Sequence, residues 1–303
     1  MIKQWDGQPI TEAGIYTMPK EAYHADPCAE PSLSRSCIEV LINKSPKHAH
    51  AFHPRLGNML EEKEESEGML VGTVVDELLL GGQRNIAVSP YDDYRKGEAR
   101  EWRDACYARG AIPIKEPLYA KCNTIVKSFA DNLNRKNFPG LAEDFPTTNF
   151  QHIFVWKENG VWNRAMLDTY GHYIWDLKTT KADAAPAEWT RKQLFGAALE
   201  LQAAYYLKAH HKVTGEKPKD FLFAVIEQVA PFDCYPVQVD HVDLIRAEEQ
   251  IEYAQRVWRQ CLDSGVWPGY SNKIIHASSP AYVQAGWEEQ KALQKTLEMD
   301  KAA

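Results

Sequence analysis

Two aspartates and a lysine at short spacing are the clearest candidates for chemistry in this chain. Asp168 precedes the segment Asp176-Leu-Lys178, and both stand in short apolar stretches that we expect to be strands. Side chains alternate along a strand, so Asp176 and Lys178 share one face while Trp175 and Leu177 take the other. The same acid-x-Lys pattern occurs twice more, in charge-rich sequence: Glu61-Glu-Lys63 and Glu289-Gln-Lys291.

The turn between these two strands decides whether the aspartates meet. A two-residue loop, Gly171-His172, would send Asp168 and Asp176 to opposite faces of the sheet. A three-residue loop, Tyr170 to His172, pairs Asp168 with Ile174 and places it diagonal to Asp176 on one face. Diagonal Cβ atoms lie about 7–8 Å apart, which two carboxylates can close around a cation. We adopt the three-residue loop.

Carboxylates this close repel each other and need a counter-ion. Oxygen ligands suit a hard cation such as Mg²⁺ or Mn²⁺, which commonly also binds substrate phosphate. The alternative is a surface salt bridge between Asp168 and Lys178 on a solvated sheet face.

The composition favours an intracellular globular protein. The 303 residues are 44% hydrophobic, enough for a large core, and no apolar run approaches a membrane span or a signal segment. The six cysteines contain no C-x-x-C pair, so neither a zinc site nor a disulfide framework is indicated. A net charge of -7 argues against a protein that coats nucleic acid through its overall charge. It does not exclude DNA bound in a locally basic channel.

We expect one domain over residues 1–303, made of three parts. Residues 1–30, with four prolines, form an N-terminal arm; 31–280 form the core; 281–303 form a peripheral C-terminal helix. The stretch 91–136, rich in Arg, Lys and aromatic residues, is a candidate DNA-facing surface, although solvated helix faces have the same composition.

Several helices carry polar residues with candidate roles. Ser36-Cys-Ile-Glu39 reads as a capping box at a helix start, and a phosphate site using Ser34, Arg35 or Ser36 is the alternative. A helix over 69–80, stopped by Gly81-Gly82, has Asp76 on the border of its apolar stripe; a buried Asp76 would need a partner such as a metal ion.

The second half of the chain predicts strands over 150–180, 221–226 and 235–239 and a helix over 242–262. A helix from about 188 to 210 is apolar on nearly every side, so we expect it to be buried. Gln202 and Tyr206 share one of its faces, and the carboxylates upstream could supply the hydrogen-bond partners that a buried Gln202 requires.

The order of these motifs resembles the PDDEXK nuclease superfamily in its RecB-like form. Asp168, then Asp176-Leu-Lys178, then Gln202-Ala-Ala-Tyr-Tyr206 is similar to its acid, acid-x-Lys and Q-x-x-x-Y series. The nuclease domain of exodeoxyribonuclease VIII, RecE, and its phage-borne relatives resemble the chain more closely still. The further motifs of that resemblance are Tyr23-His24, Leu33-Ser-Arg-Ser36, Ser45-Pro46, Gly72-Thr-Val-Val-Asp76 and Trp267-Pro-Gly-Tyr270.

The resemblance implies an α/β fold with a PDDEXK (restriction-endonuclease-like) core, in which helices flank a mixed central β-sheet. It implies that Asp76, Asp168, Asp176 and the Leu177 carbonyl hold one or two Mg²⁺. The implied role of Lys178 is to orient or deprotonate the attacking water, and Gln202 and Tyr206 would brace the site or touch the DNA backbone. The family usually has His at the position of Asp76, and we expect the carboxylate to be tolerated with altered metal preference.

The resemblance also implies a Mg²⁺-dependent exonuclease that digests linear double-stranded DNA from its 5′ ends and leaves 3′ overhangs for recombination. The implied partners are DNA ends, a RecT-like single-strand annealing protein and further copies of the chain in a ring, in the cytoplasm of a bacterial cell. The spacing of the cysteines does not supply the iron–sulfur cluster of some relatives. Two alternatives stay open: an endonuclease or repair nuclease on the same core, and a non-catalytic DNA-binding recombination protein.

Overall fold

The computed structural model of the chain describes residues 1–59, 66–81, 85–134, 145, 148–181 and 184–302. Contacts divide the chain into two compact units, Met1–Pro268 and Gly269–Ala303. The second unit contains one helix, α10 (Ala281–Ala302). None of the described helices is both long enough and apolar enough to cross a membrane.

A seven-stranded mixed sheet forms the centre of the first unit, in the order β1-β2-β5-β6-β7-β8-β9. The pairs β1/β2 and β7/β8 are parallel, and the other neighbours are antiparallel. This confirms the predicted fold class. The strands are Ile2–Gln4 (β1), Gly14–Thr17 (β2), Phe150–Glu158 (β5), Val161–Tyr170 (β6), Ile174–Thr180 (β7), Phe221–Glu227 (β8) and Cys234–Gln238 (β9).

The N-terminal segment is more than an arm. Residues of β2 pair with β5, from Gly14↔Val155 to Tyr16↔Ile153, so the first strands extend the central sheet. Between β2 and the core helices lies the short helix α1 (Lys20–His24).

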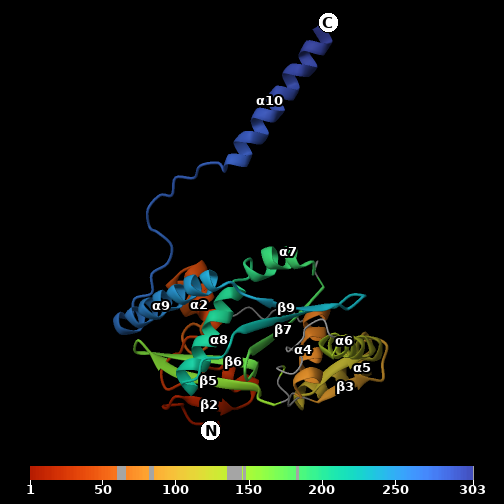
Figure 1. Ribbon diagram of the computed structural model, residues 1–303, viewed down its shortest axis with the longest axis vertical. Helices are drawn as coiled ribbons and strands as arrows, with labels where there is room; N and C mark the ends of the chain where they lie inside the picture. Colours follow the sequence, from red (N-terminus) through yellow and green to blue (C-terminus); the bar gives the residue numbers. More distant parts are fainter. Residues whose placement is uncertain (60–65, 82–84, 135–144, 146–147, 182–183, 303) are drawn as a thin grey trace. The chain divides into compact units, whose positions relative to one another are not determined.

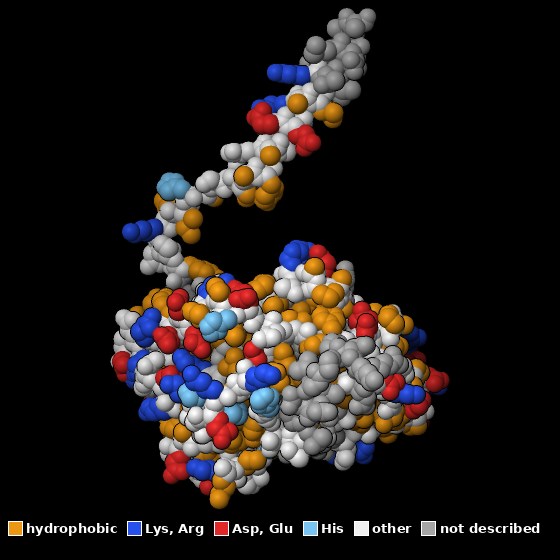
Figure 2. Space-filling model, in the orientation of Figure 1, with side chains coloured by type: hydrophobic (Ala, Val, Ile, Leu, Met, Phe, Trp, Pro, Cys, Tyr) orange, Lys and Arg blue, Asp and Glu red, His pale blue; other side chains and the backbone are white. Residues whose placement is uncertain are grey.

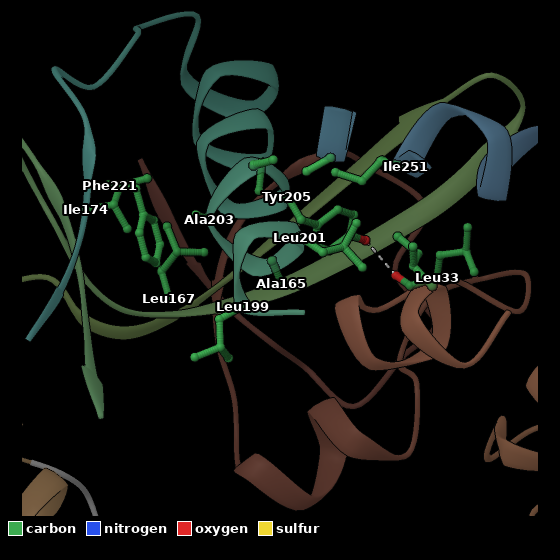
Figure 3. Close-up of a cluster of buried hydrophobic side chains, with 14 of the residues drawn as sticks. Leu33, Ala165, Leu167, Ile174, Leu199, Leu201, Ala203, Tyr205, Phe221 and Ile251 are labelled. Atoms are coloured by element: carbon green, nitrogen blue, oxygen red, sulfur yellow. Dashed lines mark hydrogen bonds between the residues drawn. The ribbon is translucent and has the colours of Figure 1, made fainter. Parts of the chain in front are cut away.

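Helices cover both faces of the sheet because its strands are apolar on both sides (Figure 1). One face packs against α2 (Arg35–Asn43), α8 (Leu199–Thr214) and α9 (His241–Ser264). Figure 3 shows this cluster, in which the Tyr205 hydroxyl donates to the Leu33 carbonyl at 2.9 Å. The opposite face packs against α4 (Glu67–Leu80) and α6 (Glu116–Asn134). Helix α3 (Pro46–Phe52) packs against α2 and α9.

A second, two-stranded parallel sheet, β3 (Ile86–Ser89) and β4 (Ile112–Lys115), lies beside α6 and α5 (Gly97–Ala108). Two arginines of this part of the chain are engaged locally, since Arg95 and Arg103 pair with Asp93 and Asp104. On the face of the first unit seen in Figure 2, basic and acidic side chains are interspersed. The predicted DNA-facing surface over 91–136 therefore stays a prediction.

Two predicted helix boundaries were wrong. The first helix begins at Arg35 with Ser34 as its cap, whose Oγ accepts from the Cys37 N–H at 3.3 Å. Ser36 lies inside the first turn, so it does not start a capping box.

The predicted helix over 188–210 is three elements: α7 (Pro186–Trp189), a π-helical turn (Thr190–Leu194) and α8. Ala198 before α8 has a φ of 49° and breaks the helix. The carbonyls of Ala197 and Ala198 instead accept from Arg35 Nη2, at 2.6 and 3.0 Å. This contact between distant segments overrides the local helical pattern.

Candidate active site

The strands β6 and β7 separate at the candidate site. They pair at Tyr170↔Ile174 and Thr169↔Trp175. The next N–H of β7 on that side, at Leu177, donates to Asp168 Oδ2 at 3.0 Å instead of to a strand carbonyl. A carboxylate therefore occupies the place of a backbone acceptor, and a fork opens between the strands.

The register between β6 and β7 corrects the predicted position of the loop that joins them. The turn has three residues, as predicted, but they are Gly171 to Tyr173 rather than Tyr170 to His172. The same register places Asp168 opposite Asp176 instead of diagonal to it. The odd loop length was the correct choice, and the register keeps the two carboxylates on one face of the sheet.

Asp176 is held on both of its oxygens. Lys178 Nζ contacts Oδ2 and Gln202 Nε2 donates to Oδ1, while the Asp176 side chain is 3% exposed. Asp176 and Lys178 point to the α8 side of the sheet, as alternation along β7 requires. The hydrogen bond from Gln202 is the bracing contact that its burial predicted.

The N–H and C=O of one strand residue point to the same side of that strand. Since the Leu177 N–H faces the fork, its carbonyl faces the fork as well. The predicted carbonyl ligand is thus directed toward the carboxylates, while Asp176 and Lys178 continue the parallel register with β8.

Asp76 reaches the fork from α4, which packs against β7. Burial, and next the negative charge of Asp168, raise the pKa of Asp76 well above the ordinary range for a carboxyl. Lys20 acts in the opposite direction on Asp76 and on Asp168. Four elements, α1, α4, β6 and β7, therefore bring charges to one place.

The charges perturb one another. Burial, and next the charge of Asp176, raise the pKa of Asp168 to about 7. Burial lowers the pKa of Lys178, but the charges of Asp176 and Asp168 outweigh burial and raise it. Lys178 is therefore an ammonium ion at neutral pH, which fits a group that orients water or offsets negative charge.

The oxygen atoms of Asp76, Asp168, Asp176 and Leu177 are suitable ligands for a divalent cation, but the side chains are not arranged around one. Among the described residues, no three His, Cys, Asp or Glu side chains stand so as to hold a metal ion. Lys178 Nζ and Gln202 Nε2 contact the two carboxylate oxygens of Asp176. Three mutually repelling carboxylates and a carbonyl are the oxygen donors that a hard cation prefers.

A cavity of about 290 Å³ opens beside Gln202. It is lined by Ser34, Arg35 and Ser36, the predicted phosphate contacts, and by Tyr206, one turn beyond Gln202 on α8. Arg35 is also tied to Glu39 at 2.8 Å and to the carbonyls before α8. The cavity thus contains the N-terminal turn of α2, whose free N–H groups favour an anion.

Sequence reasoning missed two charged residues near the fork. Lys20 Nζ lies 3.6 Å from Oε1 of Glu77, a buried carboxylate next to Asp76 on α4. Lys20 follows a proline in a segment without periodicity, so no sequence signal connects it with the site. Glu77 reads from sequence as an exposed helix residue.

Comparison with known families agrees with this geometry. The family model described as "PDDEXK-like domain of unknown function (DUF3799)" matches residues 36–279. The chain belongs to this PDDEXK-like family, which confirms the superfamily predicted from the motifs.

Among solved structures, the fold is similar to that of a protein from Eubacterium rectale described as "Putative exonuclease". The TM-score is 0.55 at 15% identity, over 87% of this chain and 96% of that one. At this identity the likeness concerns the fold. No curated protein sequence matches the chain.

Proposed function

We propose that the protein is a metal-dependent deoxyribonuclease that hydrolyses linear double-stranded DNA from its ends. The observation that carries the proposal is the fork between β6 and β7, where Asp168 and Asp176 face each other with Lys178 beside them. Membership of the PDDEXK-like family and the name of the structural neighbour support a nuclease.

The carboxylates of Asp76, Asp168 and Asp176 and the Leu177 carbonyl would hold the cation, Mg²⁺ or Mn²⁺. When bound, the cation offsets negative charge on the scissile phosphate. Lys178 has to leave Asp176 Oδ2 for the cation to be held, because the ammonium occupies that oxygen. Once released, Lys178 can hold the attacking water by hydrogen bonding, while Gln202 keeps Asp176 in place.

Ser34, Arg35 and Ser36 support a preference for DNA ends. They place hydroxyl, guanidinium and N–H donors in the cavity beside Gln202, which suits a terminal phosphate. The family resemblance adds 5′-to-3′ polarity, 3′ overhangs for recombination with a RecT-like annealing partner, and a ring of several copies. These finer features belong to the proposal.

The test is digestion of an end-labelled, 5′-phosphorylated linear duplex with Mg²⁺, with Mn²⁺ and with EDTA. The wild type should release nucleotides only with metal, and Lys178→Ala should lower the rate by about a hundredfold or more. Lys181→Ala, an exposed lysine on the same strand end paired with Glu67, is the matched control. Equal rates for wild type and Lys178→Ala would remove Lys178 from the mechanism.

Closed circular DNA separates the proposal from an endonuclease. Circles should resist the enzyme while linear DNA of the same sequence is degraded. Cutting of circles would favour the endonuclease or repair nuclease, and metal-independent DNA binding without turnover would favour the non-catalytic protein.

A further inference from the structure

Helix α1 separates two cavities. Its first residues, Lys20 and Glu21, line a cavity of about 460 Å³, and its last residues, Tyr23 and His24, line the 290 Å³ cavity that contains Ser34 to Ser36. Five helical residues extend only about 7 Å. The two cavities therefore flank one short element, close to the same carboxylates.

Two residues that line the larger cavity connect it with the fork. Glu77, next to Asp76 on α4, is one of its lining residues. Lys20, which contacts Glu77 at 3.6 Å, acts electrostatically on Asp76 and Asp168. A molecule in this cavity would contact Lys20. It would lie at the other end of α1 from the cavity that contains Ser34.

The lining has both parts that a nucleotide requires. Arg109 and Lys20 are cationic, and they face two acids, Glu21 and Glu77. Lys20 already offsets Glu77, whereas the guanidinium of Arg109 donates to Sγ of Cys106 at 3.3 Å and forms no ion pair among the described residues. An exposed guanidinium of this kind can bind a phosphate.

Apolar side chains also line the cavity, among them Met18, Phe150 and Met166. Phe150 offers a ring on which a base can stack. His152 also lines the cavity, and burial lowers its pKa, so that at neutral pH it is an uncharged partner of the Tyr170 hydroxyl at 2.9 Å. An exposed guanidinium beside an aromatic, thioether-containing wall suits a nucleotide better than a free inorganic anion.

We propose that this cavity is a second nucleic-acid subsite, which binds a nucleotide of the DNA on the side of the carboxylates opposite the Ser34–Ser36 cavity. Arg109 contacts its phosphate, and Phe150 contacts its base. This inference rests on the proposed function, since it extends the path of the DNA past the same carboxylates. It predicts that binding depends on contacts on both sides of α1.

The experiment measures equilibrium binding of a fluorescein-labelled 20-base-pair duplex in EDTA, over a range of salt concentrations. Arg109→Ala should weaken binding about fivefold and lower the salt slope by about one, because one phosphate contact is lost. Phe150→Leu should weaken binding without changing the slope, because stacking is lost and charge is not. Lys157→Ala, which removes an exposed lysine paired with Glu30, should change neither quantity.

Wild-type affinity and slope for both Arg109→Ala and Phe150→Leu would overturn the subsite. An equal loss in Lys157→Ala would also overturn it, because the effect would then be one of net charge. Binding in EDTA needs no hydrolysis, so failure of the subsite can be distinguished from failure of the proposed nuclease function. A wild type that binds DNA but never releases nucleotides refutes the proposed function alone.

Discussion

Gly72 fixes how closely α4 approaches the site, and its replacement by alanine gives the sharpest test of the geometry. A Cβ atom at Gly72 would lie 2.9 Å from Thr179 Oγ1 on β7. Thr179 Oγ1 is itself held by Gln228 Nε2 at 2.8 Å, and Gln228 also donates to the Gly68 carbonyl at 2.9 Å. Asp76 lies one turn beyond Gly72 on the same helix face.

Two opposing terms set the size of the effect. Gly→Ala inside a helix ordinarily stabilises by about 1 kcal/mol. Overpacking costs about 1–3 kcal/mol, and Thr179 cannot easily turn away because Gln228 holds it. We expect Gly72→Ala to change the free energy of unfolding by between about 0 and 2 kcal/mol in the destabilising direction. In a Thr179→Ala background the obstacle is absent, so the same change should stabilise by about 1 kcal/mol.

The assay is urea unfolding of the wild type, both single variants and the double variant. Loss of the Gln228 bond in Thr179→Ala, about 1 kcal/mol, cancels in this cycle and leaves a coupling of about 1–3 kcal/mol. Calorimetry with Mn²⁺ should find weaker binding in Gly72→Ala, because α4 and Asp76 are displaced, and recovery in the double variant.

Gly97 in α5 provides the matched control, since a Cβ there meets nothing within 4 Å. Gly97→Ala should leave Mn²⁺ binding unchanged. An identical effect of Gly72→Ala in both backgrounds would refute the proposed role of the close approach. Unchanged Mn²⁺ affinity in Gly72→Ala would separate α4 packing from the metal site.

Two further predictions concern pH. Burial alone raises the pKa of Asp26, but hydrogen bonds from His53 and Ser32 and the charge of Arg164 lower it to about 2. The same carboxyl titrates near pH 4 in the unfolded chain, so its ionised form stabilises the fold above about pH 4, and this contribution is lost as the pH falls toward 2. Urea unfolding should find that the free energy of unfolding falls by about 2 kcal/mol over this range in the wild type and not in Asp26→Asn. The pH dependence due to Asp168 has the opposite sign. Because its pKa is raised to about 7, the metal-free protein loses stability as the pH rises from about 4 to about 7. Asp168→Asn should reduce this slope and leave the part due to Asp76, whose pKa is raised as well, and an unchanged slope in the variant would contradict the assignment.

Local sequence determined much of the fold. Apolar stretches predicted strands over 150–180, 221–226 and 235–239, where β5 to β9 lie, and Gly81 and Gly265 end α4 and α9 in the left-handed conformation. Alternation along β7 also put Asp176 and Lys178 on one face. These features depend on backbone geometry within a few residues, and a sequence displays that directly.

The sequence did not determine contacts between distant segments. The exact register of β6 and β7 depends on which residues form the three-residue turn, and two placements of that turn have the same alternation of faces. The break before α8 depends on Arg35, which lies far away in the chain and binds the carbonyls of Ala197 and Ala198.

The sequence by itself determined which side chains are candidates for the site: Asp168, Asp176, Lys178 and Gln202 follow local patterns. Only the tertiary structure decided that Asp168 replaces a backbone acceptor for Leu177, and that Lys20 and Glu77 lie beside the carboxylates. The physical reason is that electrostatic and hydrogen-bond partners are selected by proximity in space. Chain folding brings α1, α4 and β7 together, and no periodicity within any one of them specifies the others.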